Sequence, residues 1–203
     1  MQPNQERRSR LSGMALDSMK TSGNAQPDLW IFGYGSLMWD GWENAYGCTR
    51  RIVADLPDHR RVFNKASIKR WGTKIAPGPT LNLVTAPHES CRGMAFQFPP
   101  ANDPSVRAYL KEREGPGFPL REHTIHISPA ERVQALVPMY EGDNLVKVAS
   151  VDDAAEMVCR AVGSGGRCID YVKGIASKLV ELNIHDPAVT DLLVAIERKQ
   201  HAV

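Results

Sequence analysis

The order of hydrophobic patterns along the chain limits the folds that it can adopt. Short continuous or alternating apolar runs, which are typical of β-strands, occupy most of the region from residue 29 to residue 140. Apolar residues repeating at i, i+3 and i+4, which are typical of amphipathic helices, interrupt these runs once and then dominate up to the C-terminus. Strands followed by a separate group of helices indicate an α+β fold.

The predicted strands share apolar or β-branched residues bounded by turn-forming residues. They are Leu29–Phe32, Arg51–Leu56, Leu81–Thr85, Gly93–Phe98, His123–Ile127 and Ala135–Tyr140. The turn signals Pro77-Gly78-Pro79 and Glu141-Gly142-Asp143 separate or bound them.

The predicted helices are marked by capping residues and by their apolar stripes. Asp103 followed by Pro104 is an N-cap and first-turn signal, and this helix ends at Gly115-Pro116-Gly117. A second helix is expected over residues 153–162, a third over residues 171–182, and a fourth from Asp186-Pro187 onward.

The first 28 residues are polar and contain a basic cluster, so we expect a flexible N-terminal extension over residues 1–28 and a single domain over residues 29–203. A transit peptide is the alternative, but Glu6, Asp17 and Asp28 count against it.

Charge and cysteine usage restrict the class of partner. The net charge of +2 gives no reason to expect nucleic acid, and the basic stretch Lys65–Lys74 is interpreted as a solvated loop. No apolar run is long enough to predict a membrane span. The 4 cysteines form no metal-binding or C-x-x-C pattern, which favours reduced thiols, no metal site and a cytoplasmic location.

The first strand runs directly into the sequence FGYGSLMW at residues 32–39. This loop begins like a dinucleotide-binding fingerprint, but Met38 stands at the place of the third glycine and no helix start follows. Ser36 also lacks the glycines of a nucleophile elbow. Two glycines can expose successive backbone N–H groups to a carboxylate or oxyanion, although an ordinary tight turn is an equal alternative.

Glu114 is the carboxylate with the most distinctive position, at the C-terminal end of the helix that begins at Asp103. The helix dipole disfavours negative charge there. Burial would raise the pKa of this carboxyl group further, which suits a group that accepts and returns a proton. From this position alone, a solvated helix end is the stronger interpretation.

Together these segments resemble the ChaC-type γ-glutamylcyclotransferases. The similar segments, in chain order, are LWIFGYGSLMW at residues 29–39, RRVF at 60–63, YLKERE at 109–114, ALVPMY at 135–140 and the glycine turn and helix start at 163–172. The sequence departs from the family pattern at Phe118, where Tyr is usual, and at Cys168, where Asn is common.

The resemblance implies a small mixed β-barrel-like sheet flanked by helices. It also implies a cofactor-free enzyme that converts a small γ-glutamyl substrate, glutathione or another γ-glutamyl peptide, to 5-oxoproline and a released amine. Glu114 would be the catalytic residue, and the substrate-binding residues would be Gly33, Tyr34, Gly35, Ser36, Leu37 and Tyr140. Contacts of Arg70 and Tyr171 with substrate are left open, as is the oligomeric state. A non-catalytic ligand-binding or regulatory protein on the same fold is the alternative.

Overall fold

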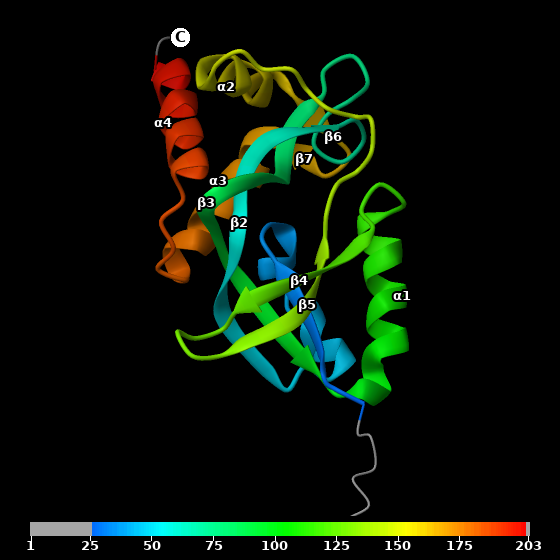
Figure 1. Ribbon diagram of the computed structural model, residues 1–203. Coiled ribbons are helices and arrows are strands. Elements are labelled where there is room, and N and C mark those ends of the chain that lie inside the picture. Colours follow the sequence, from blue (N-terminus) through cyan, green and yellow to red (C-terminus); the bar gives the residue numbers. More distant parts are fainter. Residues whose placement is uncertain (1–25, 202–203) are drawn as a thin grey trace, which may run out of the picture.

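The computed structural model describes residues 26–201 and contains a closed barrel (Figure 1). Its strands are β1 (Leu29–Gly33), β2 (Arg50–Ser67), β3 (Gly78–Phe98), β4 (Leu120–His126) and β5 (Arg132–Pro138). They pair in the order β1-β3-β2-β4-β5, antiparallel except for the parallel contact between β1 and β5. The predicted mixed barrel-like sheet is confirmed, while residues 1–25 of the expected N-terminal extension lie outside the described residues.

β2 and β3 are much longer than the sequence predicted. The two segments expected at residues 81–85 and 93–98 are parts of the single strand β3, and the strand expected at residues 51–56 extends as β2 to Ser67. Between the two predicted segments of β3, residues 87–90 are exposed. Pairing with β2 continues from Ser90 to Arg92 and is interrupted at residues 86–89. Two register shifts, typical of β-bulges, bend this ribbon so that it can close a barrel.

The helices are α1 (Asp103–Glu114), α2 (Val151–Arg160), α3 (Cys168–Glu181) and α4 (Pro187–His201). α1 covers one side of the barrel, and α4 lies on the opposite side with α2 and α3 packed against it (Figure 1). The predicted helices are confirmed to within a few residues, but the prediction of Asp103 as N-cap was wrong, because Asn102 occupies that position and Asp103 is in the first turn. None of the helices in the part of the chain described is long and apolar enough to cross a membrane.

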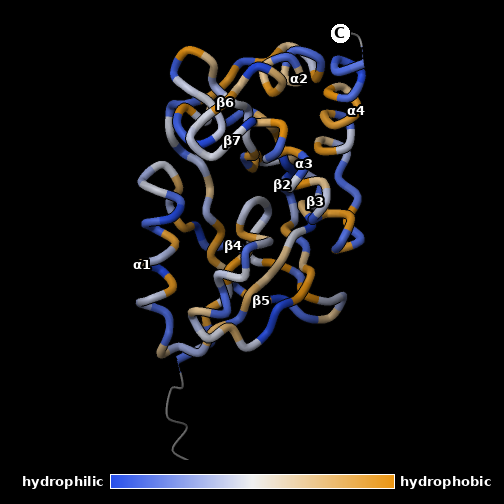
Figure 2. Tube along the Cα trace, turned by 180° about the vertical axis from the view of Figure 1, so that it is seen from behind, coloured by the Kyte–Doolittle hydropathy of each residue, from blue (hydrophilic) through white to orange (hydrophobic). Residues whose placement is uncertain are grey.

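Apolar side chains from the barrel and from all four helices form one hydrophobic core. Fully buried members include Ile31, Phe32, Phe96, Phe98, Leu110, Ile125, Ile169, Ile175, Leu192 and Ile196. Along α4 the trace in Figure 2 alternates between hydrophilic and hydrophobic residues, as expected for a helix with one buried face.

The connector between β2 and β3, residues 68–77, is held by a small hairpin of β6 (Val162–Gly163) and β7 (Gly166–Arg167). The backbone N–H of Ser164 donates to the carbonyl of Lys69 at 2.8 Å, and that of Gly165 donates to the carbonyl of Arg70 at 2.7 Å. A Cβ on Gly163 would lie 2.5 Å from the carbonyl carbon of Arg70. Only glycine therefore allows this approach.

Replacement of Gly163 by Ala is expected to lower the free energy of unfolding by about 1–3 kcal/mol, because the added methyl group meets backbone atoms that cannot rotate away. Urea denaturation measures the change. Gly174→Ala in α3 is the matched control, because its Cβ would meet no atom closer than 4.0 Å and alanine favours a helix interior. Equal unfolding midpoints for Gly163→Ala and the wild type would contradict the close packing of the hairpin on the connector.

Candidate active site

The loop after β1 offers unpaired backbone donors. β1 is buried throughout, whereas Gly35 and Ser36 are partly exposed. The residues Ser36–Met38 form a 3₁₀ turn in which the N–H of Met38 donates to the carbonyl of Gly35 at 3.0 Å. Within residues 26–201 the N–H groups of Gly35, Ser36 and Leu37 donate no hydrogen bond. These groups are free to bind an anion or a carbonyl oxygen.

Arg113 ties this loop to the end of α1. Its Nη2 donates to the carbonyl of Ser36 at 3.0 Å, and its Nη1 donates to Asp40 Oδ2 and to the Tyr109 hydroxyl, both at 2.8 Å. Its Nε lies 3.4 Å from Glu114 Oε1. Arg113 thus holds the loop and the carboxylate of Glu114 in one cluster. Sequence reasoning gave Arg113 no role, although it stands next to the predicted catalytic residue.

Glu114 is the last residue of α1 and its side chain is only 15% exposed. The interpretation of residues 112–114 as a solvated helix end is therefore wrong for Glu114. Burial raises the pKa of its carboxyl group, and the positive charges of Arg113, Lys65 and Arg70 oppose that rise. A carboxyl group in this setting exchanges its proton at higher pH than an ordinary glutamate.

Two buried tyrosines contribute to the same cluster. Burial raises the pKa of Tyr34 and of Tyr171, and the nearby charge of Glu114 adds to both shifts. Both hydroxyls therefore stay protonated at physiological pH. The N–H of Leu81 donates to the Tyr171 hydroxyl at 3.2 Å, and a Cβ on Gly35 would lie 3.9 Å from that hydroxyl oxygen. Tyr171 of α3 thus approaches the loop after β1.

Tyr140 lies two residues beyond the end of β5, so its predicted place in a strand was wrong. Its ring centroid is 5.0 Å from that of Phe118, and its hydroxyl accepts a hydrogen bond of 2.9 Å from the N–H of Asn144. Lys65 Nζ lies 5.5 Å from the Tyr140 ring and 5.6 Å from the Phe118 ring. The interpretation of Lys65–Lys74 as a solvated loop was wrong at its first residues, because Lys65 is half-buried in β2.

Arg61 supports the loop from inside the protein. Its side chain is fully buried, and its Nη1 contacts Asp186 Oδ2 at 2.8 Å. Its Nε donates to the carbonyl of Tyr34 at 2.7 Å, and its Nη2 donates to the carbonyl of Arg92 at 2.6 Å. This buried guanidinium fixes the backbone of the loop to β3 and to the start of α4. Sequence reasoning used Arg61 only as part of a matching segment.

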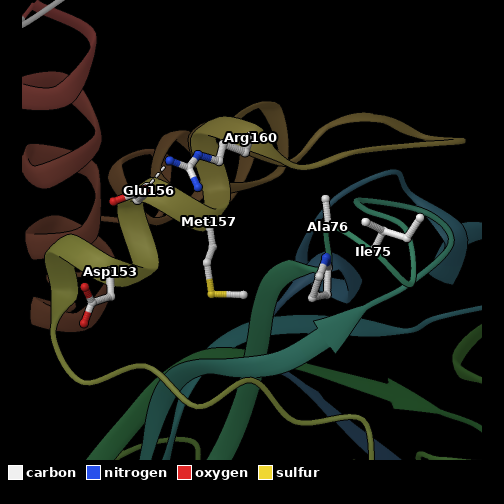
Figure 3. Close-up of a pocket in the computed structure, with 7 residues that line it drawn as sticks. Ile75, Ala76, Asp153, Glu156, Met157 and Arg160 are labelled. Atoms are coloured by element: carbon white, nitrogen blue, oxygen red, sulfur yellow. Dashed lines mark ion pairs between the residues drawn. The ribbon is translucent and has the colours of Figure 1, made fainter.

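A separate pocket of about 440 Å³ lies between the connector after β2 and α2 (Figure 3). Its lining residues are Ile75, Ala76, Pro77, Asp153, Glu156, Met157 and Arg160. Glu156 pairs there with Arg160 and also with Lys199. None of the site residues predicted from the sequence lines this pocket. The contacts of Arg113 with the loop and with Glu114 make the cluster around Glu114 the candidate active site. Residues 26–201 contain no group of three or more His, Cys, Asp or Glu side chains arranged to hold a metal ion.

Curated relatives match most of the chain. A γ-glutamylcyclotransferase 2-3 of Arabidopsis thaliana is 26% identical over 174 residues, which cover 81% of this chain and 86% of the relative. A glutathione-specific γ-glutamylcyclotransferase of Escherichia coli is 28% identical over 181 residues, which cover 84% of this chain and 73% of the relative.

The fold matches a solved structure of a γ-glutamylcyclotransferase specific to glutathione from yeast. The TM-score is 0.75 at 21% sequence identity, with 87% of this chain and 98% of the yeast chain covered. The family model described as ChaC-like protein matches residues 29–199. This match spans the barrel and nearly all of the four helices, including the loop after β1 and Glu114. The chain therefore belongs to the ChaC-like protein family.

Proposed function

We propose that this protein is a γ-glutamylcyclotransferase that converts glutathione to 5-oxoproline and cysteinylglycine. The observation that carries the proposal is Glu114, a largely buried carboxyl group of raised pKa that Arg113 joins to a loop with free N–H donors. The name of the relative from Arabidopsis thaliana supports a γ-glutamylcyclotransferase, and that of the relative from Escherichia coli supports glutathione as the substrate.

The reaction is an intramolecular acyl transfer in which Glu114 moves one proton. The α-amine of the γ-glutamyl group attacks its own γ-carbonyl carbon and forms the ring C–N bond. The Glu114 carboxylate accepts a proton from this amine and then donates it to the departing nitrogen of cysteinylglycine as the original amide bond breaks. Because amine and carbonyl belong to one molecule, holding the substrate folded supplies much of the acceleration. The reaction balances without a cofactor.

The loop from Gly33 to Leu37 would hold the γ-glutamyl group. Its free N–H groups at Gly35, Ser36 and Leu37 are suited to a carboxylate or to the oxygen that becomes negative during attack. The protonated hydroxyl of Tyr171 can donate to the same region, because its oxygen only accepts from Leu81. Tyr140 and Phe118 would form an aromatic wall beside the departing group.

The alternative is a protein on this fold that binds a γ-glutamyl compound without converting it. A protein that only binds its ligand has no need of a buried carboxyl group with a raised pKa. The presence of Glu114 therefore favours the interpretation as an enzyme. The proposal includes a cytoplasmic location, which is supported by the four free cysteines of the part of the chain described.

The test is incubation of the protein with glutathione and other γ-glutamyl peptides, without added cofactor, followed by an assay of 5-oxoproline. Calorimetric binding is measured in parallel. Release of 5-oxoproline supports the enzyme, whereas saturable binding with no 5-oxoproline supports the non-catalytic alternative.

The pH dependence of kcat/KM should show an acid limb with its midpoint above the ordinary glutamate pKa of about 4.3. The ionised form of Glu114 accepts the proton, and burial raises the pKa at which that form is lost. Arg113 opposes this rise most strongly, so Arg113→Gln should move the limb to still higher pH. Profiles of both proteins measure this shift, and midpoints at or below the ordinary value in both would contradict the assignment.

A further inference from the structure

Lys65 is a cation held within the site cluster and not used by the proposed chemistry. It lies in β2 at a register shift between Val62 and Lys65, where the strand departs from regular pairing with β3. The side chain is half-buried, and its Nζ is 5.5 Å from the ring of Tyr140 and 5.6 Å from the ring of Phe118. Two aromatic faces thus define where the ammonium group lies.

Lys65 differs from the other buried cations because no acidic side chain in the described part of the chain lies within ion-pair distance of its ammonium group. Arg61 pairs with Asp186, and Arg113 pairs with Asp40. Among the ion pairs of residues 26–201, none includes Lys65. Burial lowers the pKa of the Lys65 ammonium group, and the charge of Glu114, which acts from beyond ion-pair distance, opposes this shift only in part. A half-buried ammonium group without a counter-ion in direct contact favours a ligand that supplies one.

The cluster carries more positive than negative charge before a substrate binds. Lys65, Arg70 and Arg113 all act on the carboxyl group of Glu114. Since Arg113 is also bound to Asp40 and to the loop, the uncompensated charge lies on the side of Lys65 and Arg70. A ligand with a free carboxylate would balance it.

We propose that Lys65 binds the carboxylate at the departing end of the substrate, which is the glycine carboxylate of glutathione. This inference rests on the proposed function. The free N–H groups of the loop after β1 lie in the part of the site assigned to the γ-glutamyl group, so the second carboxylate of glutathione, at its other end, needs its own cation. Lys65 stands beside Tyr140 and Phe118, the wall assigned to the departing group. Lys65 would then make the enzyme prefer acidic γ-glutamyl peptides to γ-glutamyl amines.

The other role open to Lys65 is that of a counter-charge that only adjusts the pKa of Glu114. The two roles predict different substrate dependence. A counter-charge acts on every substrate alike, whereas a carboxylate-binding residue affects only substrates that carry the second carboxylate.

The experiment compares glutathione with its ethyl ester at the glycine carboxyl group, using wild type, Lys65→Met and Lys65→Arg. Wild type should prefer the free acid by about 10- to 100-fold in kcat/KM, the range of a charge-assisted hydrogen bond. Lys65→Met should lose that preference through a higher KM for glutathione, with the ester little changed, and Lys65→Arg should retain part of it. Lys69→Met, an exposed lysine on the adjoining connector, is the matched control and should behave as wild type.

Equal losses for both substrates in Lys65→Met, or equal use of acid and ester by wild type, would overturn the assignment of Lys65. Absence of 5-oxoproline from every substrate would instead refute the proposed function. The same comparison can be made without turnover by calorimetry on two variants, Glu114→Gln alone and Glu114→Gln combined with Lys65→Met. The affinities of both variants for glutathione and for its ester are measured. The carboxylate assignment is therefore decided even if no reaction is found.

Discussion

Replacement of Glu114 by Gln is expected to lower kcat for 5-oxoproline formation by about 100- to 10,000-fold, the contribution typical of general acid–base catalysis. Gln keeps the size of the side chain and can still contact Arg113, but it can neither accept nor return the proton. The variant should fold as the wild type does, because burial already disfavours the charged form of Glu114. Initial rates at saturating glutathione measure the change.

Glu112→Gln is the matched control, since Glu112 lies in the same helix but is exposed. It should retain wild-type kcat. If Glu114→Gln also retained it, Glu114 would have no part in catalysis, even if the protein forms 5-oxoproline.

Replacement of Arg61 by Met is expected to lower the free energy of unfolding by about 3–5 kcal/mol, the cost typical of removing one partner from a buried ion pair. The side chain of Arg61 is fully buried and donates to the carbonyls of Tyr34 and Arg92 as well as to Asp186. Met fills a similar volume but leaves all three acceptors without this donor. Urea denaturation followed by circular dichroism measures the loss.

Arg60→Met serves as the comparison, because the neighbouring Arg60 side chain is 51% exposed and pairs only with the exposed Glu89. It should change stability by less than about 1 kcal/mol, as is usual for surface ion pairs. Similar effects of the two substitutions would contradict the role of Arg61 as a buried support of the loop.

Local signals explain which parts of the fold could be predicted. The helices follow from capping residues such as the Asp186-Pro187 pair, where Asp186 Oδ1 accepts from the N–H of Val189 as an N-cap should. The length of β3 could not be predicted, because its middle is largely polar and exposed, and the strand is defined there by pairing of residues 90–92 with β2, which is distant in sequence. Barrel closure depends on such long-range pairing, which local periodicity does not record.

In the site, too, features with a local sequence signal could be predicted, whereas features that depend on long-range contacts could not. The helix-end position of Glu114 and the two glycines of the loop after β1 made both candidates, but only the resemblance to the ChaC-type family assigned them a role in the site. Arg113, Lys65 and Arg61 could not be singled out, because their roles depend on partners remote in the sequence. Arg61, for example, contacts Asp186, which is 125 residues away.

The most direct test of the central claim is the stoichiometry of glutathione breakdown by the wild-type protein without any added cofactor. Chromatography of the products should show one 5-oxoproline and one cysteinylglycine for each glutathione consumed. Glutathione that remains intact, or that is cleaved to free glutamate and cysteinylglycine, would contradict the proposed cyclisation.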